Sequence, residues 1–181
     1  GTGRGTPVLA GVRVVDLGVG VAVPEAGWLL AELGAEGIKI ESRANLDFLR
    51  RVTVEPDQPD RSMQFNDASR GHLGVALDLG TARGRELALA LCAAADVVIE
   101  NNRGGVVQRW GLDYAAIRAL NPGVIYCGFS AYGNIGPLAH IGANDLALQA
   151  HSGLMSMTGE PGRPPVRCGT AAIDLPASLA M

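Results

Sequence analysis

The sequence predicts an α/β protein with a Rossmann-like open parallel sheet and helices on both faces. Short apolar runs alternate with segments of helical periodicity along most of the chain, and apolar strands separated by helices form a parallel sheet that is covered on both sides. A length of 181 residues is typical of one domain and allows a sizeable core. A hydrophobic content of 48% with a formal net charge of -3 excludes a disordered chain.

The first elements predict a β-α-β unit. A β-branched run at 11–18 ends in glycine and predicts a strand, and the apolar residues of 23–37 recur at near-helical spacing. Gly34 stands where a glycine commonly ends a helix. The second strand is expected at 37–42, where an apolar run returns.

A polar stretch from about 42 to 74 then interrupts the alternation. Its prolines and charges predict a long loop with at most short helices, and loops of this length often carry function. The alternation resumes with a strand at 75–79, an amphipathic helix at 81–95 with Thr81 as its N-cap, and a strand at 96–101.

The last part of the chain predicts further helices around one more strand. Short helices are expected around 106–110 and 114–120, followed by a strand at 124–133. Helical periodicity returns at 143–159, a proline-rich loop follows, and a final apolar helical segment begins near Asp174. No internal repeat is visible.

Charge and composition exclude several classes of partner. The chain lacks the basic excess that binding to nucleic acid or anionic lipid requires. No stretch approaches 18 consecutive apolar residues and no signal-peptide pattern opens the chain, so a soluble cytoplasmic protein is expected. Cys92, Cys127 and Cys168 form no CxxC pair, and neither a disulfide framework nor a zinc site is indicated.

Common catalytic and cofactor motifs are incomplete. "GVGVAV" at 18–23 partly matches the dinucleotide fingerprint, but Val23 takes the third small position and Pro24 follows at once. The three histidines lack H-x-x-x-H spacing and no acidic cluster accompanies them, so no metal site is expected. The serine of "FSAYG" at 129–133 lacks the nucleophile-elbow motif.

Six segments in register identify a family over nearly the whole chain. They are "LAGVRVVDL" at 9–17, "AELGAEGIKIES" at 31–42, "VALDL" at 75–79, "ADVVIENNRGGVVQRWGLDY" at 95–114, "LNPGVIYCGFSAYGNIGP" at 120–137 and "NDLALQAHSGLMSMTGEPGRPPVRCGTAAIDL" at 144–175. Each is weak alone, but together they indicate homology rather than a shared fold only. On these segments the chain resembles the class III coenzyme A transferases, a family that includes formyl-CoA and carnitine-CoA transferases and α-methylacyl-CoA racemases.

The resemblance implies that Asp174 is the catalytic carboxylate. In this chemistry the carboxylate attacks the thioester of an acyl-CoA to form a mixed anhydride, and the released CoA thiolate then forms a thioester with the enzyme. The acceptor carboxylate completes the exchange by the reverse steps. The residues alone support another role, because an aspartate two places before a proline fits a helix N-cap, and without the family this structural role is favoured. The two roles are compatible.

The resemblance also implies a set of CoA contacts. They are Val21, Ala22, Leu77, Asn101, Asn102 and Arg109. Most of these positions lie at strand ends and in the loops that follow, where open parallel sheets bind ligands, and Arg109 in the next helix can neutralise a CoA phosphate. Alternatives remain, since Arg109 can be a solvated helix residue and Asn101 can cap the next turn. Basic residues usual in the family are replaced by Ser42 and by His72 with Leu73, which lowers the expected affinity for the adenosine phosphates.

Two departures from the family narrow the expected function. The racemase members carry a histidine where this chain has Asn144, and asparagine cannot move a proton at C2 of an acyl-CoA. Family members are about twice as long, with a second domain and interlocked homodimers. The resemblance therefore implies that 1–181 is the amino-terminal CoA-binding α/β domain of a class III CoA transferase, truncated before the second domain.

The expected activity is transfer of CoA from an acyl-CoA donor to a carboxylic acid acceptor. CoA and acyl-CoA are substrates here, no covalently bound cofactor is expected, and the expected partner is a second copy of the chain. Three alternatives stay open: a non-catalytic CoA-binding or structural fragment, a relative of the α-methylacyl-CoA racemases, and a nicotinamide oxidoreductase supported by "GVGVAV" alone.

Overall fold

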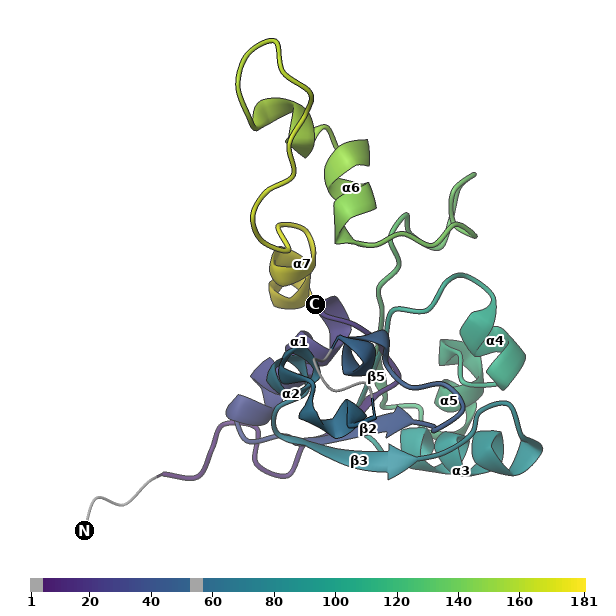
Figure 1. Cartoon of the computed structure of the whole chain (residues 1–181). Helices are drawn as coiled ribbons and strands as arrows, with labels where there is room; N and C mark the ends of the chain where they lie inside the picture. Colours follow the sequence, from purple (N-terminus) through teal and green to yellow (C-terminus); the bar gives the residue numbers. More distant parts are fainter. Residues whose placement is uncertain (1–4, 53–56) are drawn as a thin grey trace.

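The computed structural model describes residues 5–52 and 57–181. Five parallel strands form one sheet in the order β3-β2-β1-β4-β5 (Figure 1). The strands are β1 (Arg13–Asp16), β2 (Glu36–Glu41), β3 (His72–Ala76), β4 (Val97–Glu100) and β5 (Ile125–Gly128). The strand order reverses between β1 and β4, which makes their carboxyl ends the topological switch point where open α/β sheets bind ligands. The predicted Rossmann-like parallel sheet is confirmed.

Helices connect the strands and extend beyond them. The α-helices are α1 (Ala22–Glu32), α2 (Met63–Ala68), α3 (Ala82–Ala93), α4 (Val106–Trp110), α5 (Tyr114–Leu120), α6 (Asp145–His151) and α7 (Asp174–Ala180). Three 3-10 helices are η1 (Phe48–Arg51), η2 (Pro59–Arg61) and η3 (Leu154–Met157). Within the described residues, no helix is long and apolar enough to cross a membrane.

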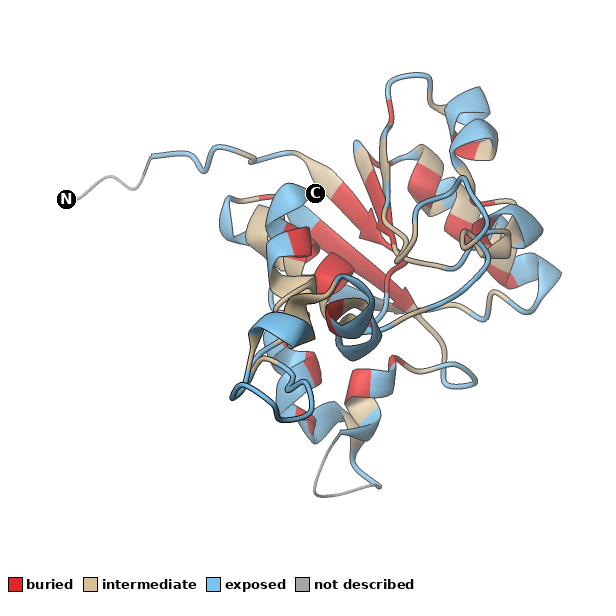
Figure 2. Cartoon of the chain, turned by 90° about the horizontal axis from the view of Figure 1, so that it is seen from above, coloured by how far each residue is buried: buried red, intermediate tan, exposed pale blue. Residues whose placement is uncertain are grey.

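Both faces of the sheet are covered, because alternate strand residues point to opposite sides. On one side α3 and α5 pack on the strands through Val15, Ile38, Ile40, Val98, Ala88, Cys92 and Ile117. On the other side α1 packs on them through Val14, Val23 and Ile99. The buried residues form a continuous band along the central strands (Figure 2).

Local signals predicted several element ends correctly. The Thr81 hydroxyl accepts from the Gly84 N–H at 3.0 Å and caps α3, as expected. Gly34 has a φ of +103°, a left-handed conformation that glycine adopts at helix ends. The helices expected around 106–110 and 114–120 coincide with α4 and α5.

The third strand was placed wrongly. The sequence predicts it at 75–79, whereas β3 begins at His72 and ends at Ala76. Its backbone ladder with β2 determines these bounds, since His72 pairs with Gly37 and Ala76 pairs with Glu41. β3 is an edge strand with mostly exposed residues, so its apolar pattern marks its ends poorly. The last strand is also shorter than the predicted 124–133.

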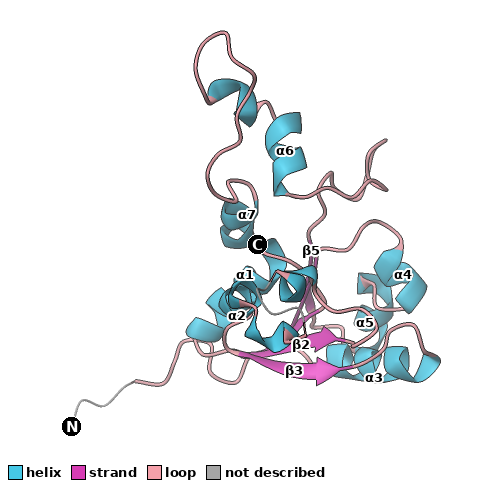
Figure 3. Cartoon of the chain, viewed as in Figure 1, coloured by secondary structure: helices cyan, strands magenta, loops and turns pink. Residues whose placement is uncertain are grey.

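The segment after β5 leaves the sheet. α6 and η3 lie outside the two helical layers, joined by long loops, and the chain then returns so that α7 packs against α1 (Figures 1 and 3). This return brings residue 174 back to the body of the fold and beside α6.

Candidate active site

Asp174 is the first residue of α7 and is partly buried. The N-cap of α7 is Ile173, and no side chain of the cap residue accepts a hydrogen bond there. Asp174 therefore does not cap its own helix, and the capping role that the residues alone favoured is wrong. Its carboxylate is left available for chemistry.

The start of α7 is capped instead by Asp145, a residue of α6. Asp145 Oδ1 accepts hydrogen bonds from the backbone N–H of Ile173 at 2.7 Å and from that of Asp174 at 3.1 Å. A carboxylate at a helix start satisfies amides that have no partner within the helix and interacts favourably with the helix dipole. Asp145 thereby fixes the backbone that carries the candidate nucleophile.

Gln149, one turn further along α6, holds the segment leading to Asp174. Its side-chain oxygen accepts from the Cys168 N–H at 2.9 Å, and its amide nitrogen donates to the Thr170 carbonyl at 3.2 Å and to Asp145 Oδ2. Gln149 is only 1% exposed, so this network is shielded from water. The i,i+4 spacing of Asp145 and Gln149 on one helix face was a signal for this pair that sequence reasoning missed.

Electrostatics at Asp174 favour a basic carboxylate. Burial raises the pKa of Asp174, and the neighbouring carboxylates of Asp145 and of Glu25 in α1 raise it further. A carboxylate that has lost part of its hydration and lies near like charges is a stronger base than an exposed one. These conditions suit nucleophilic attack on an acyl carbon.

Asn144, the residue that the resemblance sets against the histidine of the racemase members, begins α6. Its side-chain oxygen accepts from the Ala147 N–H at 3.0 Å and forms the N-cap of α6. Asparagine is among the residues best suited to this capping role.

Two adjoining cavities lie at the carboxyl ends of the strands. One, of about 290 Å³, lies beyond β1, β2 and β3, and the other, of about 650 Å³, lies between the loops after β1 and β4 and the start of α6. We call the two together the strand-end crevice; four residues line both parts, namely Val19, Asn45, Asn102 and Trp110. The crevice therefore runs from the end of β3 to α6, the helix whose Asp145 binds the backbone N–H of Asp174.

The structure brings part of the predicted contact set to this crevice. Leu77 lines the first cavity, Asn101 lines the second and Asn102 lines both. Val21 and Ala22 begin α1, where Ala22 is 4% exposed and Val21 packs on a cluster formed by Leu49, Phe65 and Ala68. Their side chains thus face the protein interior, and a ligand could reach them only through the backbone.

Like Val21 and Ala22, two further predicted residues lie outside the lining of the crevice. Arg109 is on the exposed side of α4, whereas Val106 and Trp110 of the same helix line the cavities. Asp174 does not line either cavity, and it begins α7, where Asp145 of α6 binds its N–H. The side chain of Asn101 is already engaged, because it accepts from the Val19 N–H at 2.9 Å and donates to the Val19 carbonyl at 2.8 Å.

Three amides in the loop between β1 and α1 are already bound by side chains. The N–H groups of Gly18, Val19 and Gly20 donate to Asp16 Oδ1 at 2.6 Å, to Asn101 at 2.9 Å and to Asp47 Oδ2 at 2.9 Å. A dinucleotide site directs backbone amides of this loop at the pyrophosphate. Here side chains take the amides of Gly18, Val19 and Gly20, an arrangement that disfavours a nicotinamide site at "GVGVAV".

Comparisons with known proteins find relatives of this chain. The family model for CoA-transferase family III matches residues 9–181. The chain is 37% identical over 174 residues to a succinate–glutarate CoA-transferase of Agrobacterium fabrum, which covers 93% of this chain and 44% of that protein. It is 38% identical over 180 residues to the succinyl-CoA–L-malate CoA-transferase alpha subunit of Chloroflexus aurantiacus, with 99% and 42% covered.

A solved structure has the same fold. A CAIB/BAIF family protein from Brucella suis superposes with a TM-score of 0.87 at 37% identity, covering 97% of this chain and 48% of that one. The chain thus spans less than half the length of the relatives it matches. Because the family model matches nearly all of the sequence, the chain belongs to family III of the CoA-transferases.

Proposed function

We propose that this chain takes part in the transfer of CoA from an acyl-CoA to a carboxylic acid, with Asp174 as the nucleophile. The observation that carries the proposal is the placement of the Asp174 carboxylate: its own helix does not use it, Asp145 fixes its backbone, and its pKa is raised by burial and neighbouring carboxylates. Capping by Asp145 is an arrangement that frees the carboxylate of Asp174 while fixing its position.

The proposed reaction proceeds through two anhydrides and one enzyme thioester. The Asp174 carboxylate attacks the thioester carbonyl of the donor, the carbon–sulfur bond breaks, and CoA leaves as a thiolate. The thiolate attacks the aspartyl carbon of the anhydride, which releases the donor acid and leaves CoA on Asp174. The acceptor carboxylate then displaces CoA to form a second anhydride. The thiolate attacks the acceptor carbon, which releases the new acyl-CoA and regenerates Asp174.

CoA would lie in the strand-end crevice, at the switch point of the sheet. Leu77 and Asn102 line this crevice, Asn101 shapes it through Val19, and the backbone at Val21 and Ala22 begins the adjacent helix. We place residues 1–181 as the CoA-binding domain, with Arg109 on its surface for the phosphates. The second domain and the second subunit that a class III transferase uses would complete the site.

The substrates of the relatives suggest the chemical class of acyl group. Relatives named for succinate, glutarate and malate transfer CoA between dicarboxylic acids. We extend this class to the present chain, with succinyl-CoA as the donor to be tested first. Racemisation is disfavoured, because Asn144 caps α6 with its side-chain oxygen and offers no group that exchanges a proton.

Trapping the enzyme thioester tests the proposal. A protein that carries this chain together with the second domain is incubated with succinyl-CoA and then with hydroxylamine, and peptide mass spectrometry locates the hydroxamate that forms on an activated carboxyl. We expect the modification on Asp174, and none in the Asp174→Asn variant under the same conditions. A chain that binds CoA in calorimetry but is never modified at Asp174 would establish the alternative, a non-catalytic CoA-binding module.

A further inference from the structure

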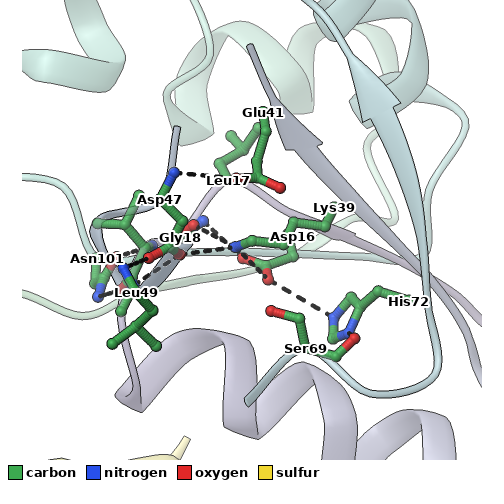
Figure 4. A network of polar contacts seen from close by, with 12 residues as sticks. Asp16, Leu17, Gly18, Lys39, Glu41, Asp47, Leu49, Ser69, His72 and Asn101 are labelled. Carbon is green, nitrogen blue, oxygen red and sulfur yellow. Dashed lines mark hydrogen bonds and ion pairs between the residues drawn. The ribbon is translucent and has the colours of Figure 1, made fainter. Parts of the chain in front are cut away.

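Lys39 is a buried ammonium in the middle of strand β2. Its side chain is only 2% exposed, and alternation along the strand directs it to the α1 side of the sheet. Lysine is almost never fully buried unless it is paired. Here Nζ donates to the Gly18 carbonyl at 2.7 Å and lies 3.4 Å from Asp16 Oδ2 and 3.5 Å from Asp47 Oδ2 (Figure 4).

Both carboxylates around Lys39 are fully buried, and both also hold the loop after β1. Asp16 accepts from the Gly18 N–H at 2.6 Å, and Asp47 accepts from the Gly20 N–H at 2.9 Å. Lys39 itself binds the Gly18 carbonyl. One cation and two anions, from β1, β2 and the segment before η1, therefore converge on the three-residue loop at 18–20.

The position of this loop determines the shape of the strand-end crevice. Val19 lies between the two anchored glycines and lines both cavities. Its N–H and carbonyl are held from the other side of the switch point by Asn101, which follows β4. A shift of the loop would therefore move a wall shared by both cavities.

We propose that Lys39 is a positioning residue, whose buried ammonium, shared between Asp16 and Asp47, fixes the loop at 18–20 and thereby the strand-end crevice. The link to CoA binding rests on the function proposed above, whereas the hold on the loop does not. Removing the cation would leave two buried carboxylates without their shared partner, and such groups are strongly unfavourable in a low-dielectric interior.

His72 of β3 does not replace Lys39 in this cluster. Its Nε2 lies 3.6 Å from Asp16 Oδ2, beyond hydrogen-bond distance, and has no hydrogen-bond partner (Figure 4). It contacts one carboxylate from the side away from the loop. Lys39 reaches both carboxylates and the loop carbonyl with a single group.

The test compares Lys39→Met with Arg13→Met. Methionine keeps the length of the unbranched side chain without its charge. Arg13 is a matched control on the neighbouring strand, because its ion pair with Glu36 is exposed and lies at the opposite end of β1. For each folded variant, amide hydrogen exchange is measured by NMR and the Kd for CoA by calorimetry.

We expect the amides of 18–20 to exchange at least about tenfold faster in Lys39→Met than in the chain without the substitution. This increase should exceed any increase for the amides of β4, which report a general loss of stability. The Kd for CoA should rise by about tenfold or more. Arg13→Met should leave both quantities within about twofold. A Lys39→Met protein that keeps the protection of the loop and the CoA affinity would overturn the proposal.

A second variant decides the question if Lys39→Met does not fold. Asp47→Asn removes one charge of the cluster and keeps one side-chain oxygen, which can accept from only one of the two amides that Asp47 binds, that of Gly20 at Oδ2 or that of Leu49 at Oδ1. These two amides should lose protection first, and unchanged protection would again overturn the role of Lys39. If the chain without any substitution binds no CoA, the proposed function is refuted. The exchange rates of the amides at 18–20 would still test whether Lys39 fixes the loop.

Discussion

Asp174 carries a carboxylate that its own helix does not use, so its presence has an energetic cost without a structural benefit. The N-cap position belongs to Ile173, and the amides at the helix start are bound by Asp145. Burial and two nearby carboxylates raise the pKa of Asp174, which means that the fold disfavours its ionised form. Destabilising polar groups of this kind are typical of active sites.

The first prediction separates catalysis from capping at Asp174. Because the carboxylate is not a cap, Asp174→Asn and Asp174→Ala should have free energies of unfolding within about 0.5 kcal/mol of each other. Both should abolish modification of the protein by succinyl-CoA and hydroxylamine. Urea unfolding followed by circular dichroism measures the stabilities. A loss of about 1 kcal/mol or more in the alanine variant alone would instead reveal a capping role.

The second prediction concerns the pH dependence of stability at the same residue. The pKa of Asp174 in the folded state lies above the ordinary value of 3.8. The contribution of Asp174 to the free energy of unfolding is therefore most favourable below pH 3.8, where the residue is protonated in both the folded and the unfolded state. This contribution is lost as the pH rises through the pKa of the folded state. Asp174→Asn should therefore be more stable than the unmodified chain at neutral pH, by about 0.5–1 kcal/mol. This advantage should shrink toward acid pH; an advantage that grows there would contradict the raised pKa.

At the scale of elements, α6 acts as a support for the start of α7. Its Asp145 and Gln149 bind the backbone at 168, 170, 173 and 174 through two side chains one turn apart. This support spans a loop with little regular structure, so the position of Asp174 depends on a few hydrogen bonds rather than on a packed layer.

The third prediction tests this support with Asp145→Ala. Loss of the carboxylate leaves two amides of α7 unbound, which should cost about 1–2 kcal/mol of stability and reduce modification of Asp174 by about a hundredfold, because the nucleophile is misplaced. Asp113→Ala is the matched control, since Asp113 caps α5 through the amides of Ala115 and Ala116 far from Asp174. It should cost similar stability and leave the modification unchanged. If both variants lost modification of Asp174 to the same extent, α6 would have no special role in positioning that residue.

The elements that the sequence predicted well are those with local signals. Thr81 caps α3 through an amide three residues away, and Gly34 follows the end of α1 with a φ of +103°. β3 lacked such a signal, because its ends depend on pairing with β2. The supports of the site were also unpredictable, since Asp145 binds residues 28 and 29 positions away and Asn101 binds a residue 82 positions away. Contacts of this range leave no periodic mark in the sequence.

At the scale of the whole molecule, the alternation of apolar strands and helices predicted the parallel sheet, but only the structure shows which strand ends meet. The resemblance to the family indicated Asp174 and the contact positions, yet it did not reveal that Asn101 binds Val19 or that Ala22 is buried. The arrangement of β1 beside β4 brings these loops together, and Asp174 in α7 does not line the strand-end crevice that they form.

The last prediction uses this arrangement to distinguish CoA from a nicotinamide dinucleotide as the ligand. A ligand that binds only the folded chain stabilises it by about 2.7 kcal/mol at a hundredfold excess over its Kd, which corresponds to a rise of about 5–10 °C in Tm for a chain of this size. We expect CoA to produce such a shift and NAD to produce none, because a dinucleotide site of the Rossmann type uses the amides at 18–20, which Asp16, Asn101 and Asp47 occupy, whereas the CoA phosphates are proposed to pair with Arg109 and not with this loop. Thermal unfolding is monitored by circular dichroism, with free adenosine as a control for binding of the base alone. An equal shift with NAD would show that the loop can release its amides to a phosphate, and it would favour the oxidoreductase alternative over CoA transfer.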